Sequence, residues 1–299
     1  MFDHVLVGVD GAEGGRDAIA LAKRLSHGGR LTFGAVYRDE PLAWRGSSAA
    51  FTAAQRERAE GQLKAALEEA GVDASLRWHG AATVGRGLHE LAEATGADLL
   101  VIGSSRRGIM GRVLLGDDTR NSINGAPCAV AVAPAGYAGR RGELIEIGVG
   151  YDGSPESEHA LTVARALAEA HGSRLSAFEA VHLPAYMFTG PPMPDEATIT
   201  AMIEEAREQV DSLQGVEGHA AYGSAAEELT VFSASLDLLV IGSRSYGPVG
   251  RIVHGSTAQD LARRCHCPLL VLTRSAREAD AAREARATQE TLTATGTTP

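Results

Sequence analysis

The sequence predicts an α/β protein built from two tandem domains, each a doubly wound, five-stranded parallel sheet with helices on both faces. Three observations support this prediction: an internal repeat, short apolar strands that alternate with amphipathic helices, and a glycine-rich loop that joins a strand to a helix in each copy. Strands and helices that alternate at this spacing form parallel sheets, because each helix has to carry the chain back to the edge where the next strand begins.

The internal repeat is clearest around the two glycine-rich loops. Residues 99–119 read LLVIGSSRRGIMGRVLLGDDT, and residues 238–257 read LLVIGSRSYGPVGRIVHGST. The positions that recur at one constant spacing are Gly103 and Gly242, Gly108 and Gly247, Gly111 and Gly250, Arg112 and Arg251, and Gly116 and Gly255. Agreement over about twenty residues indicates a duplicated unit.

Length and charge restrict the class of protein. The chain has 299 residues, so each copy is long enough to bury a core of its own. Lysine and arginine number 28 against 38 aspartates and glutamates, which gives a formal net charge of −10. This charge argues against a large nucleic-acid footprint and against attraction to anionic lipid, so we expect no nucleic-acid partner.

Cysteine usage and the first residues indicate the compartment. Three cysteines are too few for a disulfide framework. The opening MFDHVLVGVD lacks the basic and long apolar stretches of a signal peptide, and no apolar run approaches the ~18 residues of a membrane helix. We therefore expect a soluble, cytoplasmic protein without a membrane partner.

The first domain is expected to span residues 1–138. Its helices repeat apolar residues every three or four positions and end at glycines, as Ala18, Leu21 and Leu25 do before Gly28. The expected strands are His4–Val9, Leu31–Tyr37, Ala74–His79, Leu99–Ile102 and Ala129–Ala133; the expected helices follow Gly11 and cover Ala53–Ala70, Gly87–Thr95 and Asp118–Asn124.

The second domain is expected to span residues 143–274 and to repeat this order after a short linker. The expected strands are Glu146–Tyr151, Arg174–His182, Gly218–Tyr222, Leu238–Ile241 and Pro268–Thr273; the expected helices follow Gly153, cover Asp195–Leu213 and Ala225–Ser233, and continue from Ala258. Residues 275–299 form a polar tail, poor in large apolar residues, which is predicted to be disordered with some fraying helix.

The last strands of the two copies are predicted to pair about a pseudo-twofold axis. Both Ala129–Ala133 and Pro268–Thr273 are apolar, short and expected at the edge of their sheets, and an unpaired edge is an aggregation liability. The linker allows either copy to reach the other. We therefore expect an intrachain pseudo-dimer, and a homodimer of chains stays open.

The second glycine loop is the candidate ligand site. The strand Leu238–Ile241 ends at Gly242, a loop of small residues follows, and Gly255-Ser256-Thr257 opens a helix. The first amides of a helix have no internal partner, and the helix dipole favours negative charge there. Glycines let the backbone approach a ligand closely. The arrangement predicts a phosphate site.

Other motifs favour structural interpretations. Residues 148–153 match G-x-G-x-x-G, but the first two glycines lie inside the expected strand, and Asp152 would face the pyrophosphate. Cys265-His266-Cys267 has no second pair of metal ligands, and adjacent strand residues point to opposite faces, so we expect structural thiols. Because neither G-x-x-x-x-G-K-[ST] nor G-x-S-x-G occurs, a P-loop enzyme and a hydrolase triad are disfavoured.

The second loop resembles that of universal stress proteins, in which a strand is followed by G-x2-G-x9-G-[ST]. Gly242, Gly255 and Ser256 keep this spacing, while Ser245 stands where the second glycine belongs. The resemblance covers about 270 residues as two tandem domains. It implies an adenine nucleotide alpha hydrolase-like fold.

The first loop departs further from the pattern. Gly103 and Gly116 fit, but Arg106 replaces the second glycine and Asp117 replaces the hydroxyl residue. Asp117 and Asp118 would put two carboxylates at the helix start, where phosphate should bind, and we interpret them as helix caps. The first site is therefore predicted to be degenerate.

The resemblance also implies the outline of an ATP site. It places an aspartate after the first strand of each copy, and a valine near the end of the second strand, where backbone groups would meet adenine. The candidate residues for ATP, with Mg²⁺, are Asp152, Gly153, Val181, Gly242, Ser243, Arg244, Gly247, Gly250, Arg251, Gly255, Ser256 and Thr257 in the second copy, and Asp10, Val36, Gly103 and Gly116 in the first.

Three functions remain open at the level of sequence. The resembling family includes members that bind ATP through this loop and others that do not. The leading hypothesis is an ATP-binding stress-response or regulatory protein without a catalytic group. The alternatives are a structural or partner-binding stress protein with two vestigial sites, and a slow ATPase, although no candidate base is evident.

Overall fold

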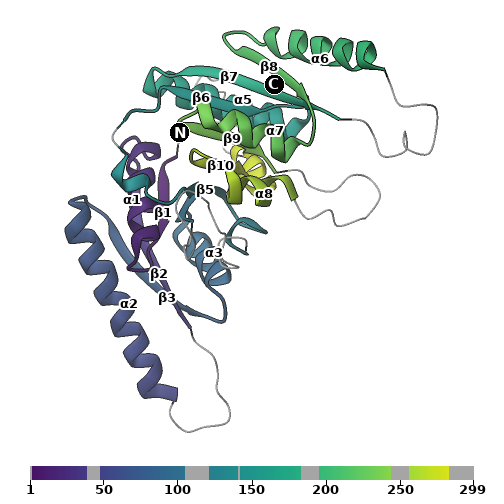
Figure 1. Cartoon of the computed structure of the whole chain (residues 1–299). Coiled ribbons are helices and arrows are strands. Elements are labelled where there is room, and N and C mark those ends of the chain that lie inside the picture. Colours follow the sequence, from purple (N-terminus) through teal and green to yellow (C-terminus); the bar gives the residue numbers. More distant parts are fainter. Residues whose placement is uncertain are drawn as a thin grey trace, which may run out of the picture.

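The computed structural model describes residues 2–38, 48–104, 121–140, 142–182, 195–243 and 256–282. Its centre is one ten-stranded sheet with the strand order β3-β2-β1-β4-β5-β10-β9-β6-β7-β8. Within each copy the neighbouring strands run parallel, and the second copy mirrors the order of the first. Figure 1 shows this sheet running through the whole molecule, with helices on both of its faces. The predicted fold class is confirmed.

The strands lie where the apolar runs predict them. The strands are β1 (His4–Gly8), β2 (Arg30–Arg38), β3 (Ser75–Ala81), β4 (Leu99–Gly103), β5 (Ala129–Ala133), β6 (Glu146–Gly150), β7 (Arg174–Val181), β8 (Glu217–Tyr222), β9 (Leu238–Gly242) and β10 (Leu269–Leu272). The central strands β4, β5, β9 and β10 are buried almost throughout, as expected for strands covered on both faces.

The helices follow the predicted order, but several begin earlier than expected. The helices are α1 (Glu13–Leu25), α2 (Ser48–Ala70), α3 (Val84–Thr95), η1 (Tyr137–Gly139), α5 (Pro155–His171), α6 (Glu196–Asp211), α7 (Ala225–Phe232), η3 (Ser233–Ser235) and α8 (Ser256–Arg264). Within the described parts of the chain, no helix is both long enough and apolar enough to span a membrane.

Two hydrophobic layers cover the two faces of the sheet. On one face, Val5 and Val7 of β1 pack with Leu21 of α1, in a layer that also contains residues of α2, α5 and α6. On the other, Leu6 of β1 packs with Leu88 of α3, in a layer that continues through α7 and α8. Alternate residues of one strand thus lie in opposite layers, because successive side chains of a strand point to opposite faces of the sheet.

The two copies join through their last strands, as predicted. β5 and β10 pair antiparallel, with Leu270 opposite Ala131 at the centre of the seam. The linker is fixed against the first copy: the carboxylate of Asp17 accepts hydrogen bonds from the backbone amides of Gly136 at 2.9 Å and Ala138 at 2.8 Å. The chain therefore builds an internal pseudo-dimer with one continuous sheet.

Residues 275–282, the start of the tail predicted to be disordered with some fraying helix, belong to a helix at 274–282. Ala276 is only 6% exposed. Arg277 lies 3.5 Å from the carboxylate of Glu156, and Asp280 lies 3.3 Å from the ring of His159. Both partners belong to α5. The segment is therefore ordered through contacts with that helix and not through a high content of apolar residues.

The three cysteines are buried free thiols. Burial raises the pKa of Cys128 and of Cys265 to about 12, and raises the pKa of Cys267 well above its usual value. These thiols therefore stay protonated at neutral pH, which fits the structural interpretation of Cys265 and Cys267.

Candidate nucleotide site at the carboxyl ends of the central strands

The candidate site of each copy lies where the strand order reverses. From β1 the chain passes first to β2 on one side and later to β4 on the other, and β6 stands between β7 and β9 in the same way. In open α/β sheets, ligands bind in the crevice at the carboxyl ends of such strands. The order brings Asp10 and Gly103 to one end of the first copy, and Asp152 and Gly242 to the matching end of the second.

The two aspartates stabilise the turns in which they stand. In the first copy, the carboxylate of Asp10 accepts hydrogen bonds from the backbone amides of Ala12 at 2.9 Å and Gly15 at 3.2 Å, and so caps the start of α1. In the second copy, the carboxylate of Asp152 accepts from the amide of Ser154 at 3.1 Å. Each aspartate therefore has a structural role at a helix start, whatever it binds.

Glycine follows each aspartate for a conformational reason. Gly11 has φ +72° and Gly153 has φ +69°, a left-handed conformation that side chains with a Cβ rarely adopt. These glycines turn the chain from the strand into the helix. Gly153 was predicted to lie at the site, and the structure places it in this turn beside Asp152.

Gly103 and Gly242 are required by packing between elements. A Cβ on Gly103 would overlap the backbone carbonyl of Gly14 in α1, and a Cβ on Gly242 would overlap the carbonyl of Glu156 in α5. The carboxyl ends of β4 and β9 therefore touch the first turn of the helix that follows the neighbouring strand, β1 or β6. Both glycines were predicted to allow the close approach of a ligand, and in the structure they also make this helix–strand contact.

The residue after each of these strands continues the sheet. The backbone amide of Ser243 donates to the carbonyl of Leu272 at 2.9 Å, and that of Ser104 donates to Ala133 at 2.8 Å. Ser243 was predicted as a ligand residue. Because its amide is already paired, its hydroxyl is the group that it can offer a phosphate.

The two valines do not occupy equivalent positions. In the sheet register, Gly8 of β1 lies opposite Gly34 of β2, whereas Gly150 of β6 lies opposite Phe178 of β7. The counterpart of Val36 is therefore Ala180, and Val181 corresponds to Tyr37. Val36 and Ala180 contact the same hydrophobic layer. Both valines lie near the end of the second strand, as predicted, but they differ by one residue in register and so point to opposite faces of the sheet.

The helix after the second loop begins as the anion-site argument requires. α8 starts at Ser256, so Ser256 and Thr257 belong to its first turn, where backbone amides lack intrahelical partners. Ala258 and Leu261 are buried against the sheet, as predicted. The remaining candidate residues lie outside the described part of the chain; they are Gly116, Arg244, Gly247, Gly250, Arg251 and Gly255, together with Asp117 and Asp118 of the first loop.

Glu179 is a residue near the second site that the sequence argument missed. It lies on β7, and its carboxyl pKa is raised by burial and by the charge of Asp152. In the sheet register its counterpart in the first copy is Ala35, so only the second copy has this extra carboxyl group. A single acid within the strand sequence RLSAFEAV was the available signal.

Tyr151 and Glu158 also distinguish the second copy. Tyr151 directly precedes Asp152, where the first copy has Val9, and its hydroxyl forms a short hydrogen bond with the carboxylate of Glu158 on α5. Burial and this hydrogen bond raise the pKa of Tyr151 to about 12. The space beside the second strand–helix turn is therefore occupied by a phenol ring.

The fold and the strand-end site define a class of protein: a tandem pair of doubly wound α/β domains with a glycine-rich loop at each point of strand-order reversal. The profile of the universal stress protein family matches residues 1–134 and again residues 146–273. The chain therefore belongs to the universal stress protein family.

Relatives and solved structures agree with this assignment. A universal stress protein of Thermus aquaticus is 33% identical over 129 residues, which cover 41% of this chain and 93% of that protein. One universal stress protein of Mycobacterium tuberculosis is 25% identical over 294 residues, covering 90% of this chain and 99% of the relative. A second is 30% identical over 186 residues, which span 63% of that relative.

The crystal structure of a universal stress protein from Archaeoglobus fulgidus has the same fold. It is 18% identical, with a TM-score of 0.67, and the match covers 91% of this chain and 98% of that one. At this identity the likeness concerns the fold alone.

Proposed function

We propose that this universal stress protein binds ATP with Mg²⁺ at the carboxyl ends of β6 and β9, and that it acts as a nucleotide-responsive regulatory protein of the stress response. The observation that supports this proposal is the start of α8 at Ser256, directly after the second glycine loop. A helix start that follows a glycine-rich loop offers unpaired amides and a positive dipole end to phosphate oxygens.

The charges at the second site favour a metal complex of the nucleotide over the free anion. Asp152 and Glu179 place two carboxyl groups close to one another at the same strand ends. Two acids would repel a bare triphosphate, whereas Mg²⁺ bound by phosphate oxygens accepts carboxylate or water ligands. Binding is therefore expected to depend on Mg²⁺.

The test is calorimetric titration of the full-length chain with ATP, with and without Mg²⁺. We expect about one ATP per chain, because the sequence predicts the carboxylates of Asp117 and Asp118 at the helix start of the first copy, where they would repel phosphate. Gly255→Asp adds a side chain and a charge in the phosphate path and should abolish binding. Gly116→Asp is the matched control and should change binding little, because the first loop already has a carboxylate at the next position, Asp117.

Two results would contradict the proposal. Two equal sites in the unchanged protein would refute the asymmetry between the copies, and no binding with Mg²⁺ present would favour a partner-binding protein with vestigial sites. Asp117→Ser removes one carboxylate from the first loop and should create a second, weaker site. Phosphate release followed over hours separates slow hydrolysis from binding alone.

A further inference from the structure

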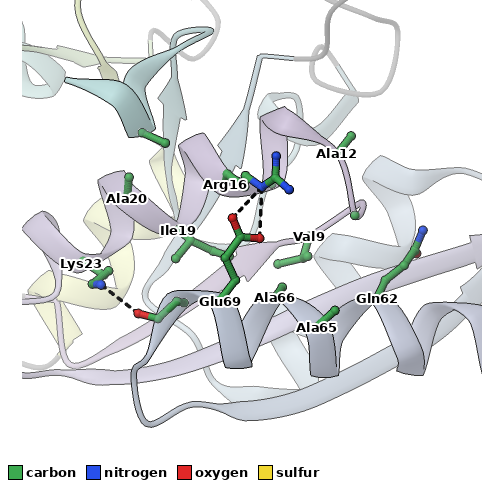
Figure 2. A pocket seen from close by; sticks show the side chains of 14 residues that line it. Val9, Ala12, Arg16, Ile19, Ala20, Lys23, Gln62, Ala65, Ala66 and Glu69 are labelled. Carbon is green, nitrogen blue, oxygen red and sulfur yellow. Dashed lines mark hydrogen bonds and ion pairs between the residues drawn. The ribbon is translucent and has the colours of Figure 1, made fainter.

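A groove of about 390 Å³ begins at the strand–helix turn beside Asp10 in the first copy and runs between α1 and α2, away from the strand ends. Figure 2 shows its floor, where Val9, Ile19 and Ala66 meet. Most of its lining is aliphatic, and no aromatic side chain contributes. The lining residues are Val9, Gly11, Ala12, Gly15, Arg16, Ile19, Ala20, Lys23, Gln62, Ala65, Ala66, Glu69, Ala70 and Ala138.

The groove is elongated along α1. It follows α1 from Ala12 to Lys23, and at the α-helical rise this stretch measures roughly 17 Å. Small side chains on the facing surfaces leave the space open, because alanines on both helices cannot reach across it. The helices are bridged at the rim by the ion pair of Arg16 and Glu69, at 2.9 Å, and by the ammonium of Lys23, which donates to the carbonyl of Ala70 at 3.1 Å (Figure 2).

The second copy fills the equivalent space with side chains. Tyr151 stands where the first copy has Val9, is 6% exposed, and bonds to Glu158, the counterpart of Arg16. Gly11 and Gly153 approach Gln62 and Gln209, which aligns α2 with α6 and makes Leu213, two residues beyond the end of α6, the sequence counterpart of Ala66. Leu213 packs against the core. The first copy therefore has smaller residues than the second at these two positions, Val9 and Ala66, both of which line the groove.

The rim carries an excess of positive charge. Glu69 is paired with Arg16, and across the described residues no carboxylate lies within ion-pair distance of Lys23. The amino end of α1 is already capped by the carboxylate of Asp10. An anionic group on a ligand is therefore favoured at the Lys23 end of the groove.

We propose that the α1–α2 groove binds a free, unbranched fatty acid, with the alkyl chain extended along the alanines and the carboxylate at Lys23. An extended chain matches the length and the methyl-lined walls, and burial of its methylenes provides the affinity. This ligand site is separate from the proposed ATP site.

The experiment titrates the full-length chain with dodecanoate below its micellar concentration, followed by calorimetry. We expect saturable binding of one molecule per chain. Val9→Tyr and Ala66→Leu, which copy the residues of the second domain, should each lower the affinity roughly tenfold or more, because they fill the groove. Ala54→Leu, at an exposed position of α2, is the matched control and should bind like the unchanged protein.

Lys23→Gln tests the position of the carboxylate. It should weaken binding of dodecanoate and leave binding of dodecanol, which has no charge, unchanged. Circular dichroism checks that each variant is folded, and Ala66→Leu serves as the test if Val9→Tyr does not fold. Unsaturable binding, or unchanged affinity in both filling variants, would overturn the proposal; an equal effect of Lys23→Gln on both ligands would overturn the placement of the carboxylate. Titration with ATP should be unaffected by Ala66→Leu.

Discussion

Glu179 carries a cost of burial that depends on pH. Its carboxyl pKa is raised above the usual value, first by burial and then by the neighbouring charge of Asp152. A group whose pKa is higher in the folded state favours folding while it is protonated. That contribution is complete below the unfolded pKa, near 4.5, and is lost as the pH rises through the folded value.

Glu179→Gln should therefore stabilise the protein at pH 7 and change its stability little at pH 4. The amide keeps the shape of the side chain but cannot ionise, so the unfavourable charge near Asp152 disappears. Urea unfolding at the two pH values measures the difference in free energy. Glu204→Gln, at an exposed position on α6, is the control. Equal effects of Glu179→Gln at both pH values would contradict the linkage.

At the scale of elements, the helix at 274–282 is held by contacts with α5. Its first turn is capped by the hydroxyl of Thr273, which accepts from the amide of Ala276 at 3.1 Å, and the side chain of Ala276 is buried in the layer shared by both copies. The segment therefore forms part of the core of the chain, although its composition is that of a solvated helix.

Ala276→Asp should destabilise the folded state by about 2 kcal/mol or more, because it places a carboxylate in an apolar layer. Ser275→Asp is the neighbouring control: Ser275 is exposed at the start of the same helix, where a negative charge is favoured by the dipole. Chemical unfolding of the two variants gives the comparison. Similar stabilities would show that the helix does not pack on the core in solution.

At the scale of the whole molecule, the antiparallel pairing of β5 with β10 turns two domains into one sheet. The hydrophobic layer over one face contains buried residues of both copies, among them Tyr137 of the linker, which is 2% exposed. The hydroxyl of Tyr137 accepts a hydrogen bond from the guanidinium of Arg24 at 2.7 Å. The seam thus combines backbone pairing, a shared core and a fixed linker.

Separation of the copies should expose the β5 edge. We expect residues 1–140, expressed alone, to self-associate or to unfold at a lower denaturant concentration than the full chain. Without the second copy, an apolar edge strand and part of the core become exposed to solvent. Analytical ultracentrifugation and urea unfolding, with the full chain as reference, measure both properties. A monomeric half as stable as the full chain would refute the structural importance of the seam.

Much of this architecture follows from local pattern. Apolar runs, helical periodicity and terminal glycines set the strands and helices, and the repeat around Gly103 and Gly242 indicated two copies. The seam was predictable because short apolar strands at a sheet edge need a partner. For the candidate site, the sequence predicted the aspartates, their glycines and the start of α8, since each belongs to a single strand–turn–helix unit.

By itself, then, the sequence determined the fold class, the order of elements and the ends of the strands where a ligand would bind, because these depend on residues close together in the chain. Only the tertiary structure decided that Gly242 touches α5, that Val36 and Val181 differ in register, and that the helix at 274–282 packs on α5. It also decided that Tyr151 fills a space that Val9 leaves open. These features depend on contacts between elements that are distant in the chain. A local pattern of apolar and polar residues predicts which side of an element is buried, but not which other element covers it.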